Sequence, residues 1–334
     1  MTAGPASGRF ARPVKRSTPL VASLGTMRPG TRTFYELAVR SAVRAIASGL
    51  EEALDLGALA RPAALAPLHF HHVFRGMVGE TPLELHRRLR LERAARQLID
   101  SDDPVTQVAF GAGYETHEAF TRAFRQAYGA PPSDYRAGAR AAASSCRRPP
   151  ATELAARSGV HVDAGPCPDP WFPPSEGALA MDVVIENLPE RTVFALRHVG
   201  PYASISSAFR SFGDIAGPAG LFGLPGAALV GIYHDDPETT PASELRSDAG
   251  VVVPPGTSIP AGLTAVRLPA GAYARTRHAG PYSTLGDAWS RLMGDWLPRS
   301  GERAANGPCL ELYLNDPTTA APEELLTDLY VPLA

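Results

Sequence analysis

Residues 105–136, VTQVAFGAGYETHEAFTRAFRQAYGAPPSDYR, combine two amphipathic segments with a glycine-containing turn between them. The apolar spacing predicts a short helix over 105–110 and a longer helix over 117–128. Thr116 directly precedes the second helix, where a hydroxyl group caps free backbone N–H groups. A short helix, a tight turn and a second helix are typical of a helix-turn-helix.

The residues before this stretch also have helical periodicity, which extends over 34–136. A long helix is predicted over 83–99, with Leu91, Ala94, Ala95 and Leu98 as its buried stripe. We therefore expect an all-α module in this part of the chain.

Composition is that of an ordinary globular protein, with 334 residues, 44% hydrophobic and 20% charged. Residues 1–150 contain 21 Lys and Arg against 13 Asp and Glu, whereas the remainder contains 11 against 21. This division predicts that only the first half meets nucleic acid. No apolar run approaches the roughly 20 residues of a membrane span. The three cysteines lie far apart, which fits a reducing cytoplasmic location and neither a disulfide framework nor a zinc site.

The predicted organisation has four parts. We expect a disordered basic arm over 1–33, the DNA-binding module over 34–137, a flexible linker rich in Ala, Arg, Ser and Pro over 138–178, and a second domain over 179–334.

The quoted stretch closely resembles the second helix-turn-helix of the AraC-type transcription regulators, including its closing Gly-x-x-Pro-x-x-Tyr-Arg over 129–136. LHFHHVFRGMVGETPLELHRRLRLERAARQLI, residues 68–99, resembles the first recognition helix and the connecting helix of that family. The resemblance implies a double helix-turn-helix whose recognition helices enter adjacent major-groove segments.

The resemblance also implies roles for individual side chains. The expected base contacts are Leu68, His71 and His72 in the first motif, and His117, Glu118 and Arg122 in the second. The expected phosphate contacts are Arg75, Arg88 and Arg125, and the alternative for each exposed arginine is a solvated helix face.

The first motif departs from the family pattern. Pro62 stands where the first helix should still run, Ala64 holds the turn position usually taken by Gly, and Ala66 replaces the usual Ser or Thr cap. These departures predict a shorter or less rigid first motif. His69 and His72 lie one helical turn apart, but two imidazoles are too few for a metal site, so no metal is expected.

The second half contains an internal duplication. The motif at 197–202, RHVGPY, recurs 80 residues later as RHAGPY, and the pairs Tyr233 and Tyr313, and Asp248 and Asp328, keep the same offset. We expect an α+β domain of two strand-helix-strand repeats, about 181–260 and 261–334, with pseudo-two-fold symmetry and a groove where the repeats meet.

This half resembles the GyrI-like effector-binding domain over 181–334, on the repeated Gly-Pro-Tyr and the closing Glu-x-Tyr-x-Asn-Asp-Pro over 311–317. The resemblance implies that the carboxylate at Glu311 lines a groove for a small, often cationic, molecule. Independently, the counterpart of Glu311 in the first repeat is Gly231, so this carboxylate breaks the symmetry of the duplication, as a binding site must. A solvent-facing carboxylate is the alternative.

Five residues are candidates for effector contact: Glu311, Tyr313, Tyr282, Tyr202 and Trp289. Phe209 is the counterpart of Trp289, which favours a core position for both rings and makes Tyr282 the preferred aromatic contact.

These features predict a sequence-specific DNA-binding transcription regulator that responds to a small-molecule effector. The alternative is a GyrI-like hydrolase for strained genotoxic natural products, with Glu311 as general acid or base. A third hypothesis is inhibition of a protein through the acidic surface. The expected partners are double-stranded DNA and the effector, with RNA polymerase as a further candidate; no cofactor and no membrane are expected.

Overall fold

The computed structural model describes residues 29–144, 152, 154, 161–162, 170–171, 181–237 and 239–334. The chain divides into two compact units, one over residues 34–178 and one that contains residues 179–334. Most of the predicted arm and linker lies outside the described residues. At their edges, helix α1 already begins at Pro29 and helix α7 continues to Ser144. The start of the predicted flexible linker is therefore helical, because its alanines and arginines are good helix formers.

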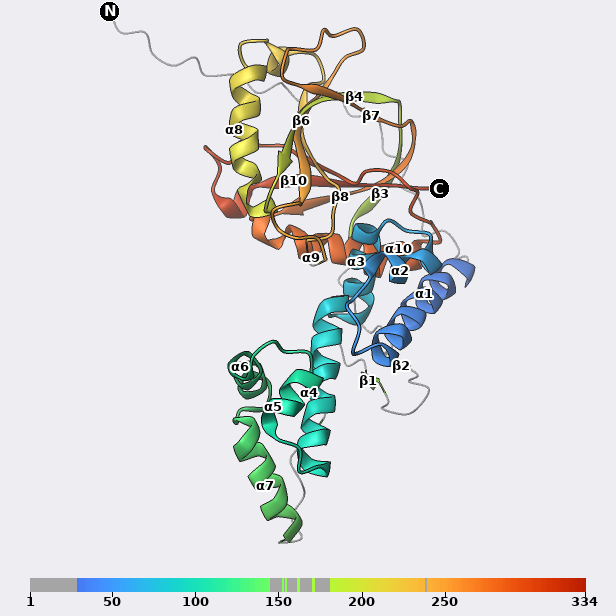
Figure 1. Cartoon of the computed structure of the whole chain (residues 1–334). Helices are drawn as coiled ribbons and strands as arrows, with labels where there is room; N and C mark the ends of the chain where they lie inside the picture. Colours follow the sequence, from blue (N-terminus) through green and yellow to red (C-terminus); the bar gives the residue numbers. More distant parts are fainter. Residues whose placement is uncertain are drawn as a thin grey trace, which may run out of the picture. The chain divides into compact units, whose positions relative to one another are not determined.

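The first unit is built from helices (Figure 1). In chain order they are α1 Pro29–Ser48, α2 Leu56–Ala60, α3 Pro67–Val78, α4 Pro82–Asp100, α5 Val105–Gly111, α6 His117–Tyr128 and α7 Pro132–Ser144, with a 3₁₀ turn at Arg61–Ala63 and a two-stranded pair β1 His161–Val162 and β2 Pro170–Trp171. No helix among the described residues is long and apolar enough to cross a membrane.

The first helix-turn-helix is short, as its sequence predicts. Helix α2 ends at Ala60 and changes to a 3₁₀ turn that contains Pro62. Ala64 takes the left-handed turn conformation with φ 51° and ψ 34°, which a side chain disfavours. Ala66 precedes α3 without a side-chain cap. Each departure from the family pattern thus has a visible structural consequence.

The second helix-turn-helix has regular ends. Thr116 caps α6 by accepting a hydrogen bond from Ala119 N at 3.1 Å, and Gly129 ends the helix with φ 76°. The predicted stripe of α4 is buried and packs with Phe120 and Phe124 of α6. Arg136, the last residue of the closing motif, donates to Leu98 O at 3.1 Å and Asp103 O at 2.6 Å, which ties α7 to the end of α4.

Two described positions beyond α7 return to this helical core. The hydroxyl of Tyr128 donates to Thr152 O at 2.6 Å, and Leu154 N donates to Glu92 Oε1 at 3.1 Å. Leu154 also packs against the apolar cluster of α4 and α6. These contacts attach a point of the predicted linker to the DNA-binding unit.

The second unit contains an antiparallel eight-stranded sheet in the order β3-β8-β10-β9-β5-β6-β4-β7. The strands are β3 Val183–Leu188, β4 Arg191–Val199, β5 Ala228–Tyr233, β6 Arg246–Val253, β7 Thr264–Leu268, β8 Gly271–Ala279, β9 Leu310–Tyr313 and β10 Leu326–Pro332; the helices are α8 Ile205–Ala216, α9 Leu285–Arg291 and α10 Leu297–Ser300. The strand order reads as two equivalent halves that meet at β9 and β5, which confirms the predicted pseudo-two-fold symmetry.

The sheet buries side chains on both faces. Phe194, Ala249 and Val251 pack against α8, which lies on β4 and β6 (Figure 1). Val193, Ile232 and Leu310 belong to a separate apolar cluster. Because side chains of a strand alternate between faces, Leu310 and Leu312 join this cluster while Glu311 and Tyr313 point to the opposite face.

Candidate functional site

The second recognition helix presents a polar face. Glu118, Arg122 and Arg125 are exposed and His117 is half-buried, while Phe120 and Phe124 are fully buried on the other side. The face that is free of the core therefore carries the three residues predicted to contact bases and one predicted to contact phosphate. The capped N-terminus of α6 is the end from which a recognition helix enters the groove.

The first recognition helix differs from its prediction. Leu68 is 8% exposed and His71 is 5% exposed. A side chain that contacts bases must be exposed on the protein surface. His72 and Arg75 are half-buried. The burial of Leu68 and His71 does not fit the base contacts predicted for them. Among the described residues, no three potential metal ligands lie together.

Arg88 does not fit the predicted phosphate contact. Its Nε donates to Glu80 at 3.0 Å and its Nη1 donates to Glu92 at 2.9 Å, and its side chain is 12% exposed. Both carboxylates are buried, so they need this guanidinium as a counter-charge. Arg88 has a structural role between α4 and the turn before it.

The symmetry axis of the sheet unit passes between β5 and β9. Gly231 and Glu311, which are counterparts in the duplication, are direct cross-strand partners. The hydroxyl groups of the counterpart tyrosines, Tyr233 and Tyr313, lie 3.0 Å apart. The two repeats thus meet at a position where only the second repeat carries a carboxylate.

Glu311 is enclosed by aromatic hydrogen-bond donors. Trp289 Nε1 donates to Oε1 at 2.8 Å, and the hydroxyl of Tyr313 donates to Oε2 at 2.8 Å. The residue is 4% exposed. Burial raises the pKa of Glu311 above its ordinary value, and hydrogen bonds from Trp289 and Tyr313 only partly oppose this effect. The carboxyl group is thus closed to solvent. General acid–base catalysis with an attacking water would require a rearrangement that opens this site.

The remaining predicted effector residues surround this group in part. The ring of Tyr282 contacts that of Tyr313 at a centroid distance of 5.3 Å, and Tyr282 is 38% exposed. Trp289 is 6% exposed, so the core position expected from Phe209 is correct, but its N–H group also binds Glu311. Four of the five predicted residues therefore lie together: Glu311, Tyr313, Tyr282 and Trp289.

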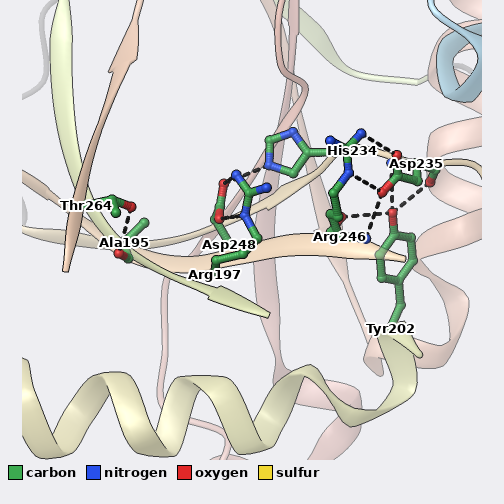
Figure 2. Close-up of polar contacts among 8 residues, drawn as sticks. All are labelled: Ala195, Arg197, Tyr202, His234, Asp235, Arg246, Asp248 and Thr264. Carbon is green, nitrogen blue, oxygen red and sulfur yellow. Dashed lines mark hydrogen bonds and ion pairs between the residues drawn. The ribbon is translucent and has the colours of Figure 1, made fainter. Parts of the chain in front are cut away.

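Tyr202, the fifth, occupies the equivalent place in the other repeat. Its hydroxyl donates to Asp235 O at 2.7 Å and accepts from Asp235 N at 2.9 Å (Figure 2). Its ring contacts Tyr233 at 4.9 Å rather than Tyr313. Tyr233 is the site residue that the sequence reasoning did not name as a contact, although its offset of 80 from Tyr313 was a sufficient signal.

Other residues of the repeated motifs have structural roles. Asp248 is 1% exposed and is bound by Arg197, while His234 Nε2 lies 2.7 Å from its Oδ2 (Figure 2). In the second repeat, Arg277 binds Asp328 at 2.7 Å and 2.9 Å. In each repeat an arginine thus neutralises the charge of this buried aspartate, which explains why the Arg and Asp pair recurs.

The two units define the class of this protein: a DNA-binding helix-turn-helix module joined to a duplicated α+β domain. Residues 181–334 match the family model of the GyrI-like small molecule binding domain, and residues 59–138 match a helix-turn-helix domain model.

Individual relatives match one unit each. Over 139 residues the chain is 34% identical to a DNA gyrase inhibitor of Yersinia enterocolitica, covering 40% of this chain and 85% of the relative. It is 31% identical to the probable transcriptional regulator YgiV of Escherichia coli K12, covering 47% and 98%. It is 41% identical to the HTH-type transcriptional regulator Rv1931c of Mycobacterium tuberculosis over 81 residues, covering 24% and 31%.

The chain therefore belongs to the GyrI-like family in its C-terminal part and joins that domain to an AraC-type helix-turn-helix domain. It is a DNA-binding transcription regulator with a small-molecule-binding domain.

Proposed function

We propose that this regulator reads promoter DNA mainly through α6 and that an organic monocation bound at Glu311 changes its transcriptional activity. The observation that carries the effector proposal is a carboxyl group present in only one of two repeats, buried on their symmetry axis and held by aromatic donors.

The chemistry of this enclosure favours a cation. A buried carboxylate needs a positive partner, and the rings of Trp289, Tyr282 and Tyr313 beside it are of the kind that attracts a delocalised cation. A bound cation would take the place of the Tyr313 hydroxyl at Glu311. Because only one carboxylate is present, the match is to a ligand with one positive charge.

The DNA proposal rests on the exposed face of α6. Arg122 supplies the paired donors that match the edge of guanine, and Glu118 can accept from the amino group of cytosine. Arg125 supplies phosphate affinity without sequence information. RNA polymerase is a further proposed partner, since a regulator of this class acts at promoters.

Two linked measurements test the proposal. Fluorescence anisotropy with a duplex selected by the wild-type chain from a random pool should show a loss of about 1–3 kcal/mol for Arg122→Ala, with relaxed preference at one base pair. Thermal shift with N-methylquinolinium should show stabilisation that Glu311→Gln abolishes.

Glu323→Gln, at an exposed carboxylate of the same domain, is the matched control and should behave as the wild type. Equal stabilisation of the wild-type and Glu311→Gln chains by the cation would contradict the effector site. Unchanged affinity and base preference in Arg122→Ala would contradict the DNA-reading face.

A further inference from the structure

Two arginines of the connecting helix α4 are directed at the turn of the second helix-turn-helix. Arg93 Nη2 donates to Gly111 O at 2.8 Å. The guanidinium of Arg90 fills the space beside Gly113: a methyl group on that glycine would lie 1.1 Å from Arg90 Nη2 and 2.1 Å from its Cζ. Gly113 has φ +73°, so the turn needs glycine for its backbone and for the approach of Arg90.

The Arg90 side chain is half-buried, with its guanidinium against the Gly113 turn. Its Nε atom is buried and has no hydrogen-bond partner among the described residues, and burial lowers the pKa of the guanidinium. A phosphate-binding arginine extends its donors into solvent, whereas the Arg90 guanidinium lies against the Gly113 turn. This position against the turn points to a role in the turn itself.

The turn transmits this contact to the recognition helix. Tyr114 follows Gly113, and its ring contacts that of Phe120 on α6 at 5.4 Å. Phe120 is fully buried between α6 and the rest of the core. The path from α4 to α6 therefore runs from Arg90 through the turn backbone and Tyr114 to Phe120.

The first motif lacks this arrangement. Its left-handed turn residue is Ala64, which carries a Cβ where Gly113 has none. The second motif also holds the exposed residues assigned to base contact. The docked arginine thus occurs in the motif whose helix orientation matters most for base recognition.

We propose that Arg90 is a positioning residue for DNA reading, which docks on the Gly113 turn and fixes the angle at which α6 presents its polar face to the major groove. The inference rests on the proposed reading of DNA by α6. Arg90 acts through the turn and touches no base, so its loss should remove discrimination between sequences while phosphate-driven affinity remains.

The test compares Arg90→Ala and Arg90→Lys with Arg87→Ala, an exposed arginine on the same helix, in the full chain. Affinities are measured for the selected duplex and for a scrambled duplex across a salt series, at a temperature where thermal scans show every variant folded. For both Arg90 variants we expect about a tenfold or greater loss on the selected duplex, and a change within about twofold on the scrambled duplex. Lys fails to rescue because it lacks the planar guanidinium.

Arg87→Ala should leave the ratio of the two affinities unchanged. Gly113→Ala displaces the Arg90 side chain and also strains the turn backbone, so part of its effect on discrimination should disappear in the Arg90→Ala background. Any of three results would overturn the proposal. These are an unchanged ratio of selected to scrambled affinity in Arg90→Ala, full rescue by Arg90→Lys, and simple additivity of the effects of Gly113→Ala and Arg90→Ala. Arg122→Ala, measured in parallel, separates failure of this inference from failure of the proposed function. An unchanged ratio of selected to scrambled affinity in Arg122→Ala would contradict DNA reading by α6 itself.

Discussion

Gly231 and Glu311 face each other across β5 and β9, although 80 residues separate them in the chain. The glycine is required by its neighbours: a methyl group at Gly231 would lie 2.7 Å from the hydroxyl oxygen of Tyr313 and 3.2 Å from Cε2 of Tyr233. Gly231 of the first repeat thus leaves room for the hydroxyl group of Tyr313, which donates to Glu311 in the second repeat.

Gly231→Ala should therefore loosen the Glu311 site. The added methyl group pushes Tyr313 from Glu311, and overpacking of this kind costs about 1–3 kcal/mol. The expected result is a lower unfolding temperature in thermal scans of the full chain. Gly213→Ala on α8 is the matched control, since open space surrounds that position and Ala is the better helix former. An unchanged unfolding temperature for Gly231→Ala would contradict the tight contact.

Glu311 should make stability depend on pH in a defined direction. Burial raises its folded pKa above the unfolded value, so its protonated form is favoured in the folded chain. Its contribution is fully present below the unfolded pKa and is lost as the pH rises through the folded pKa. Glu311→Gln, which stays neutral, should gain stability relative to the wild type over this interval, by up to about 1.4 kcal/mol per pH unit. Urea unfolding of both chains at a series of pH values measures the difference, and parallel curves would rule out the buried acid.

Binding of a cation at the same site should release a proton. A cation stabilises the ionised carboxylate, so affinity for N-methylquinolinium should rise by up to about tenfold per pH unit below the folded pKa of Glu311 and level off above it. Titration calorimetry in buffers of different ionisation enthalpy counts the released protons. The Glu323→Gln chain should release the same number as the wild type. No dependence on the buffer below the plateau would show that the cation does not meet a protonated Glu311.

Much of this site was predictable because a duplication provides an internal comparison. The alternation of Leu310 and Leu312 with Glu311 and Tyr313 fixed the faces of β9, and the missing carboxylate at Gly231 identified the asymmetric residue. The hydrogen bond from Trp289 was not predictable, because the sequence indicates that a ring is buried but not which way its N–H group points.

The DNA-binding unit shows a different limit. Caps and turns follow local rules, so the weak first motif and the strong second motif were readable from residues such as Ala64 and Thr116. Arg88 could not be placed in this way. Its partner Glu80 precedes helix α4, outside the helical periodicity. Only the tertiary fold shows that both Glu80 and Glu92 are buried.

The ion pairs of Arg88 predict a loss of stability rather than a loss of phosphate contact. Arg88→Ala leaves Glu80 and Glu92 as buried carboxylates without their counter-charge, which should cost about 3–5 kcal/mol of folding free energy. Where the variant is folded, the slope of log affinity against log salt should equal that of the wild type, because no phosphate contact is removed. Arg125→Ala, at an exposed position on α6, should instead reduce that slope. A reduced slope for Arg88→Ala would restore the phosphate role.

The uncapped start of α3 predicts a gain in stability from one added hydroxyl group. Ala66 has the extended backbone of an N-cap, with φ −62° and ψ 148°, but no side chain that can accept from the first turn. Ala66→Ser should supply that acceptor and stabilise the helical unit by about 1 kcal/mol. Thr116→Ala removes the equivalent cap of α6 and should destabilise the unit by a similar amount. Circular dichroism melts of the two variants should shift in opposite directions, and a decrease for Ala66→Ser would mean that Pro67 alone sets the start of α3.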